Sequence, residues 1–197
     1  RDWMLSNGTS HPLDVEAGIA NALAATLYIL ALPGSTYMYQ GEELGLHEVT
    51  DIPEKAIQDP QYLRNNKVDK GRDGCRVPLP WATSGKSFGF GSGGAHLPQP
   101  QWFGKYSVEA EEKEPHSPLA IYRKALELRK SLQTKEEIKW HKTKDVSVLH
   151  YARPNGWHCI TNFRSQSYPM PKGEILISSQ PLVDGRIPAG TTVWFKK

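Results

Sequence analysis

The stretch "DVEAGIANALAATLYILALPGSTYMYQGEELG" (residues 14–45) decides the fold class. Its first part is apolar on nearly every side. Acidic residues at its start and Pro33-Gly34 at its end are the start and stop signals expected for a helix. The run "STYMYQG" (residues 35–41) follows as a short β-prone segment. A covered helix, a tight turn and a short buried strand form the αβ part of an α/β unit. The apolar run is too short to span a bilayer, so a membrane partner is not expected.

The composition and the hydrophobic periodicity of the chain change twice after this unit. Residues 46–118 are irregular and rich in glycine, proline and aromatic residues, which favours a long packed loop with a function over a disordered one. Residues 117–132 regain a helical period. The segments "VSVLHYARPNGWHCITNF", "GEILISS" and "TTVWFKK" predict strands separated by turns, so residues 134–197 are expected to form a small antiparallel β module.

Composition excludes several function classes. The 197 residues carry a net charge of +3 from scattered lysines and arginines, so no nucleic-acid partner is expected. The run "GFGSGG" fits a dinucleotide-binding pattern, but no helix follows it, and no cofactor is expected. The histidines are scattered and the two cysteines, Cys75 and Cys159, lack ligand spacing, so no metal is expected. With few cysteines and no signal peptide, a cytoplasmic location is expected.

The most unusual short segment is "GRDGCRVPLPW" (residues 71–81), which mixes charges with glycine, proline and a terminal tryptophan. Prolines fix the backbone, glycines allow tight turns, and tryptophan offers a large apolar surface. These features indicate a loop packed into a defined shape, and such loops on a rigid scaffold often carry functional residues.

Four segments together resemble a known family: "ALPGSTYMYQGEELGL", "GRDGCRVPLPW", "QWFGKYSVEAEEKEPHSPLAIYRKALELRK" and the closing β module. They are similar to the carboxy-terminal part of α-glucosidases of the α-amylase family, of the bacterial oligo-1,6-glucosidase and maltase type. The resemblance implies an α/β plus all-β fold, with the end of a (β/α)8 TIM barrel followed by an antiparallel β-sandwich. It implies that residues 1–133 hold the last barrel helices, the eighth strand and the long active-site loop, and that residues 134–197 form the carboxy-terminal β domain.

The same resemblance implies that the chemistry resides elsewhere. A retaining glycosidase uses two carboxylates that flank the scissile bond. In this family they follow the fourth and fifth strands, with an Asn-His-Asp motif after the seventh, and "LSNGTSH" (residues 5–11) is interpreted as lying beyond that motif. No catalytic residue is therefore expected in this chain, and the chain alone is expected to be inactive. Its implied partners are an oligosaccharide and the amino-terminal remainder of the same barrel; the alternative is a non-catalytic sugar-binding or assembly module.

Five residues are candidates for the site. The resemblance implies that Arg72 reaches the innermost glucose, the alternative being an arginine that only fixes the loop. Glu42 is assigned to the substrate-binding rim or to pairing with a loop arginine. Asp73 and Arg76 are expected to hold the loop's shape, because buried charges need partners. Trp81 is expected to structure the loop, with stacking on sugar as an alternative. Cys75, within the same loop, is expected to be a small buried filler.

Overall fold

The computed structural model describes residues 14–197, so the segment 5–11 discussed above lies outside the described residues. Residues 39–119 form one compact unit, and residues 15–38 together with 120–197 form a second. This division differs from the expected division after residue 133. The two long helices group with the β module because their apolar side chains share one core with its sheet.

The elements of the first unit are short. They are η1 (Glu42–Leu44), η2 (Glu54–Ala56), α3 (Pro60–Arg64), η3 (Asp73–Cys75), η4 (Lys86–Gly89), η5 (Gln101–Tyr106) and α4 (Val108–Glu111). They are held together by their own apolar core, which contains Val49, Ile52, Val77, Phe88, Leu97 and Phe103. The long loop is therefore packed as its aromatic content predicted.

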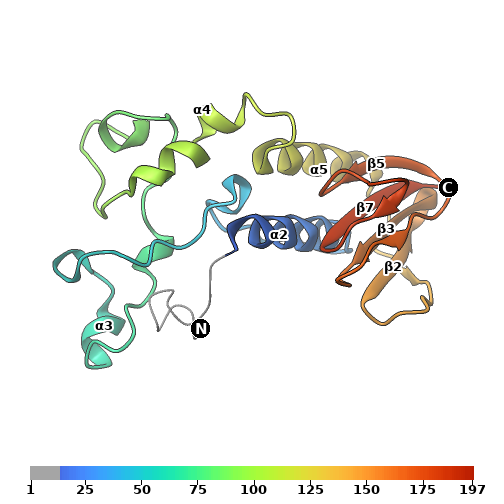
Figure 1. The fold of residues 1–197 in the computed structure, drawn as a ribbon, viewed down its shortest axis with the longest axis horizontal. Coiled ribbons are helices and arrows are strands. Elements are labelled where there is room, and N and C mark those ends of the chain that lie inside the picture. The colour runs from blue at the N-terminus through green and yellow to red at the C-terminus, as the bar shows by residue number, and fades with distance from the viewer. Residues whose placement is uncertain (1–13) are drawn as a thin grey trace. The chain divides into compact units, whose positions relative to one another are not determined.

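The second unit contains the two long helices and two antiparallel sheets. Its helices and its larger sheet can be followed in Figure 1. Its elements are α2 (Val15–Leu30), α5 (Pro118–Leu132), β1 (Lys139–Trp140), β2 (Val148–Arg153), η6 (Pro154–Gly156), β3 (Trp157–Asn162), β4 (Tyr168–Pro169), β5 (Glu174–Ser178), β6 (Arg186–Ile187) and β7 (Thr191–Lys196). The five-stranded sheet has the order β1-β2-β3-β7-β5, and β4 pairs with β6 in the small sheet. The β2–β3 hairpin turns through Asn155 and Gly156, both with positive φ, as the "RPNG" sequence predicted.

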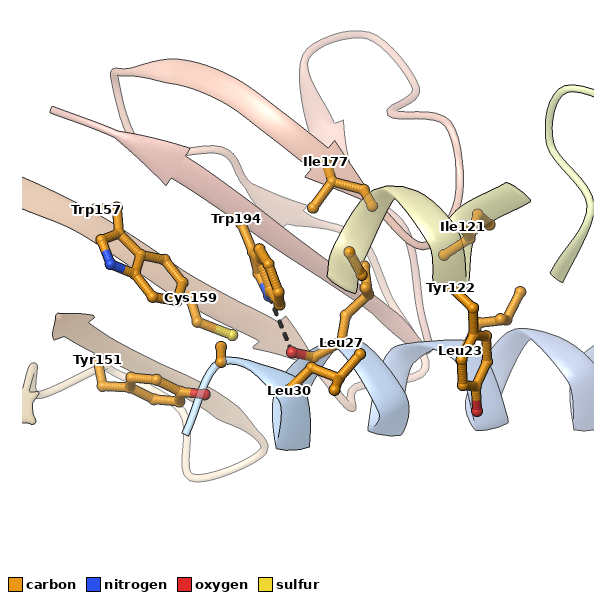
Figure 2. Packing of buried hydrophobic residues seen from close by; sticks show 12 residues of the cluster. Leu23, Leu27, Leu30, Ile121, Tyr122, Tyr151, Trp157, Cys159, Ile177 and Trp194 are labelled. Atoms are coloured by element: carbon orange, nitrogen blue, oxygen red, sulfur yellow. Dashed lines mark hydrogen bonds between the residues drawn. The ribbon is translucent and has the colours of Figure 1, made fainter. Parts of the chain in front are cut away.

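Helix α2 packs on one face of the large sheet (Figure 2). The indole of Trp194 donates a hydrogen bond of 2.9 Å to the carbonyl of Leu27, and the Tyr151 hydroxyl donates one of 2.7 Å to the carbonyl of Tyr28. Trp194 and Tyr151 are fully buried. Burial of such large rings stabilises the unit strongly, and their polar atoms remain satisfied.

The carboxyl end of α2 is capped by an arginine of α5. The Arg129 guanidinium donates to the carbonyls of Leu30, Leu32 and Gly34, the last two at 2.9 and 2.6 Å. Terminal helix carbonyls have no partner within the helix, so this cationic donor satisfies them and complements the helix dipole. The contact ties the two helices together next to the Pro33-Gly34 turn.

The opposite face of the large sheet is covered by the small one. Val148, Ile160, Val193 and Phe195 of the large sheet form a core with Ile187 of β6, and Tyr168 of β4 packs against it. The β module thus has two sheets that enclose an apolar layer, as expected of a sandwich.

The segment 35–41 differs from its prediction as a buried strand. Residues 35–39 pair with no strand among the described residues, and Tyr37 is 94% exposed. A strand exists only where a neighbouring strand accepts its backbone hydrogen bonds, and the described residues contain no parallel neighbour for this segment.

No helix in the described part of the chain is long and apolar enough to cross a membrane.

Candidate functional site

The segment 71–81 begins with a glycine that sequence alone could not explain. Gly71 has a φ of 75°, and a Cβ atom placed on it would lie 2.4 Å from Cγ of Asp59. Glycine at this position therefore allows both the left-handed backbone and the close approach of the Asp59 carboxylate. The loop is built against a residue twelve positions earlier in the chain.

Asp59 organises the start of this loop. Its carboxylate accepts hydrogen bonds from the backbone nitrogens of Gln61 and Arg72, at 2.9 and 2.8 Å, and from Nη1 of Arg76 at 2.9 Å. The hydrogen bonds from the backbone of Gln61 and then of Arg72, followed by the Arg76 cation, lower the pKa of Asp59. Asp59-Pro60 is the signature of a helix start, and Asp59 does cap α3, but this signature does not indicate the contacts of Asp59 with the loop.

Asp73 is 4% exposed and also holds the start of the loop, through hydrogen bonds from residues 58 and 59. Its Oδ2 accepts hydrogen bonds from the backbone nitrogens of Gln58 and Asp59. Nη1 of Arg76 lies 3.9 Å from Asp73 but only 2.9 Å from Asp59, so Asp59 is its main partner. These contacts suit the predicted loop-structuring role of Asp73 and Arg76, with the partner of Arg76 coming from outside the segment.

Arg72 is held by its backbone and not by its side chain. Its amide nitrogen donates to Asp59 and its carbonyl accepts from Sγ of Cys75 at 3.2 Å. The side chain is exposed, and its guanidinium makes no hydrogen bond or ion pair with the described residues. A fixed backbone with an unengaged planar donor can bind an external ligand that offers hydroxyl or anionic oxygens.

Glu42 and Glu43 lie in η1 and differ in their surroundings. The Glu43 carboxylate accepts a hydrogen bond of 2.8 Å from the backbone nitrogen of Gly41, whereas Glu42 is exposed. Glu42 lines a small cavity of about 80 Å³ together with Gly74 and Cys75 of the loop. The structure therefore brings Glu42 to the same cavity as part of segment 71–81, but Arg72 does not line that cavity.

Two further residues of segment 71–81, Cys75 and Trp81, are exposed. Cys75 is exposed, so the prediction of a buried filler is wrong: its thiol lies in the short η3 turn at the surface of this unit. The Trp81 side chain is 53% exposed. Trp81 contacts the loop through its backbone, donating to the carbonyl of Phe88 and accepting from the nitrogen of Glu109. Its indole remains open to a ligand or a further surface.

A larger cavity of about 320 Å³ lies beside the loop within the same unit. Its lining includes the polar residues Glu48, Asp69, Lys70 and Asp73. Burial, and then repulsion from Asp69, raise the pKa of Glu48. No sequence signal singled out this cavity, because its residues come from several separate segments between positions 48 and 74.

Glu111 is another titratable group that sequence analysis missed. It is 5% exposed, and its carboxylate accepts a hydrogen bond of 2.9 Å from the backbone nitrogen of Leu119. Burial raises its pKa to about 7, with the Leu119 hydrogen bond opposing and the charge of Glu43 adding to the rise. In the run "EAEE" nothing distinguishes this glutamate from its exposed neighbours.

The histidines also depart from the expectation that they are scattered. His141, His150 and His158 each offer a ring nitrogen, and these nitrogens lie within 4.8 Å of one another. The sequence placed them nine and eight positions apart, and only the strand register brings them together. This cluster lies in the β module and does not include any residue of segment 71–81.

Comparison with known proteins shows the family. Residues 10–137 match the model of the alpha amylase catalytic domain. A probable alpha-glucosidase of Rhizobium meliloti is 34% identical over 139 residues, which cover 70% of this chain and 25% of that protein. The oligo-1,6-glucosidase of Parageobacillus thermoglucosidasius is 31% identical over 128 residues, covering 56% of this chain and 22% of that protein.

Solved structures agree with the fold. The alpha-glucosyl transfer enzyme XgtA superposes with a TM-score of 0.70 at 28% identity, covering 89% of this chain and 35% of that chain. The trehalose-6-phosphate hydrolase of Bacillus licheniformis superposes with a TM-score of 0.73 at 21% identity, covering 95% of this chain and 40% of that chain. The chain spans about a quarter of the length of the curated relatives it matches. Since the catalytic-domain model matches more than half of its residues, the chain belongs to the α-amylase family.

Proposed function

We propose that this chain is the carboxy-terminal part of a retaining α-glucosidase that removes terminal α-linked glucose from oligosaccharides. Its role is to supply part of the glucose pocket through segment 71–81. The observation that carries this proposal is the state of Arg72, whose backbone is fixed by Asp59 while its guanidinium is exposed and makes no hydrogen bond or ion pair with residues 14–197. The match to alpha-glucosidases supports the substrate class.

In this proposal the loop acts by positioning. Asp59 and Asp73 accept backbone and side-chain hydrogen bonds and so hold the turn that precedes and follows Arg72. The guanidinium then donates two hydrogen bonds to hydroxyls of the innermost glucose, and its planar fork fixes the orientation of the sugar. Glu42 lies on the rim, where its carboxylate can accept from a sugar hydroxyl.

The bond-breaking step belongs to residues outside this chain. In the retaining route one carboxylate attacks the anomeric carbon while a carboxylic acid protonates the leaving oxygen, and water then hydrolyses the glycosyl-enzyme. The proposed partner is the rest of the same barrel. The extended segment 35–39 supports this partner, because it exposes Tyr37 and Met38 and pairs with no strand among the described residues, so a neighbouring strand could pair with it.

The proposal is tested on the longest reading frame that contains this sequence. We expect the purified product to hydrolyse p-nitrophenyl α-glucoside and to release α-glucose first, as followed by NMR of the anomeric proton. The 197-residue chain alone should give no turnover. A full-length product that binds sugars without hydrolysing them would instead support the alternative, a sugar-binding or assembly module.

A further inference from the structure

The β module gathers three histidines on one face of its large sheet. In β2 and β3, His150 lies opposite Ile160, and His158 lies two residues before Ile160 in the same strand. Directly opposite residues and residues two apart share a face, so both imidazoles extend from the same side. His141 follows β1 and donates its backbone nitrogen to the carbonyl of His150 at 2.9 Å, which places it next to that strand.

The rings are close enough to share a ligand. Nε2 of His150 lies 3.1 Å from Nδ1 of His158, and the His141 ring stacks on that of His150 with centroids 4.6 Å apart. Two nitrogens bound to one zinc ion at about 2.0–2.1 Å are separated by roughly 3.4 Å in tetrahedral geometry. The His150–His158 pair has nearly this separation, and the nitrogen of His141 lies within 4.8 Å of both.

One atom of the cluster lacks the partner that burial demands. Nε2 of His141 is buried and has no hydrogen-bond partner among the described residues. A buried nitrogen without a partner costs free energy, and native structures rarely leave one unless an ion or water satisfies it. Nε2 of His150 and Nδ1 of His158 contact each other at 3.1 Å, so these are the two nitrogens that an ion would have to join.

Burial also affects the protonation of the three imidazoles. Burial, reinforced by the neighbouring charges, lowers the pKa of His150 and of His158 to about 4 each and also lowers that of His141. Burial thus favours the uncharged imidazole, which is the form that binds a metal. The ε-ammonium groups of Lys139 and Lys197 contribute to these shifts. They also oppose a cation, so the affinity should be moderate.

We propose that His141, His150 and His158 form a binding site for a divalent transition-metal ion, with Zn²⁺ as the best fit. Three imidazole nitrogens and one water complete a four-coordinate zinc site. On binding, the proton shared between His150 and His158 moves to the outer nitrogen of its own ring, and both inner nitrogens coordinate the ion. The metal would then join β1, β2 and β3 and stabilise the module, in addition to any role of the loop in unit 39–119.

The test uses the 197-residue chain freed of metal by a chelator and titrated with Zn²⁺ by calorimetry and thermal unfolding. We expect one equivalent to bind and the melting temperature to rise. His141→Ala should weaken Zn²⁺ affinity at least about tenfold, because one of three ligands is lost. His116→Ala, which removes an exposed histidine elsewhere, should leave the affinity unchanged.

A second measurement does not depend on any variant folding. Long-range proton–nitrogen NMR of the unaltered chain should show the imidazole nitrogens of these three histidines shifting together on addition of Zn²⁺. The proposal is overturned if millimolar Zn²⁺ does not bind. It is also overturned if binding survives His141→Ala undiminished, as it would at the exposed thiol of Cys75, or if the three rings do not respond.

Discussion

Replacing Glu111 with glutamine should stabilise the protein at pH 8 and change little at pH 5. Glutamine keeps a side-chain oxygen that can accept the 2.9 Å hydrogen bond from the Leu119 nitrogen, but it carries no charge to bury. The wild-type carboxyl has a pKa of about 7 in the folded protein against 4.5 for an ordinary glutamate. Its protonated form is therefore the one that the fold favours.

The direction of the pH dependence follows from this difference in pKa between the folded and the unfolded protein. Below about pH 4.5 both the folded and the unfolded states bind the proton, and the contribution of Glu111 to stability is fully present. It is lost as the pH rises through about 7, because ionisation is then easier in the unfolded chain. At about 1.4 kcal/mol for each tenfold difference in proton affinity, the upper bound is about 3.5 kcal/mol. Partial solvation of the carboxylate lowers the expected gain to about 1–2 kcal/mol.

The assay is thermal unfolding of both proteins between pH 5 and pH 8, followed by circular dichroism. For a chain of this size we expect the variant to melt roughly 2–6 °C higher at pH 8. Glu114→Gln, at an exposed position in the same segment, is the matched control and should show no such pH dependence. A variant that is less stable at pH 8, or a difference that does not change with pH, would refute the reasoning.

Three further substitutions test the contacts that hold segment 71–81 and the apolar core between α2 and the large sheet. Gly74→Ala should destabilise by about 1–3 kcal/mol in denaturant unfolding, because its Cβ would lie 2.4 Å from the carbonyl of Val49; an unchanged midpoint would contradict the packing. Trp194→Phe should cost about 1 kcal/mol or more by losing the bond to the Leu27 carbonyl, and a neutral result would show that this bond contributes nothing. Asp59→Asn should lower the melting temperature near pH 7, and the deficit should fade as the pH falls through the lowered pKa of Asp59; a deficit that persists at low pH would exclude the charge as its cause.

The elements with strong local signals were predictable. The helix Val15–Leu30 and the hairpin of β2 and β3 are confirmed, because an apolar run with a Pro-Gly end and a "PNG" turn each specify local geometry. The segment 35–41 was expected to form a strand, but a strand depends on a neighbour that local sequence does not contain.

The site was only partly predictable, since its contacts join residues distant in the chain. Asp73 could be assigned to the loop from its own motif, whereas Asp59 holds the same loop from outside it, and its Asp-Pro helix-start signature does not indicate that contact. Likewise, the histidines at 141, 150 and 158 meet only through the register of the strands. This register is fixed by the turn between β2 and β3 and by the apolar cores on the two faces of the large sheet. The burial of Glu111 depends on how residues 111–119 pack and leaves no trace in its local composition.

In the proposed function, segment 71–81 is a rigid frame that presents Arg72 to a sugar, and a pair of variants in the full-length protein distinguishes this role from a purely structural one. Arg72→Ala should lower kcat/KM on p-nitrophenyl α-glucoside by roughly 10² or more, since each lost charged hydrogen bond contributes about 1.5–3 kcal/mol, and its melting temperature should barely change. Arg76→Ala should do the reverse, lowering stability by unpairing Asp59 while affecting kinetics less per folded molecule. Near-normal kinetics with a depressed melting temperature for Arg72→Ala would contradict the account, because the arginine would then serve only to fix the loop.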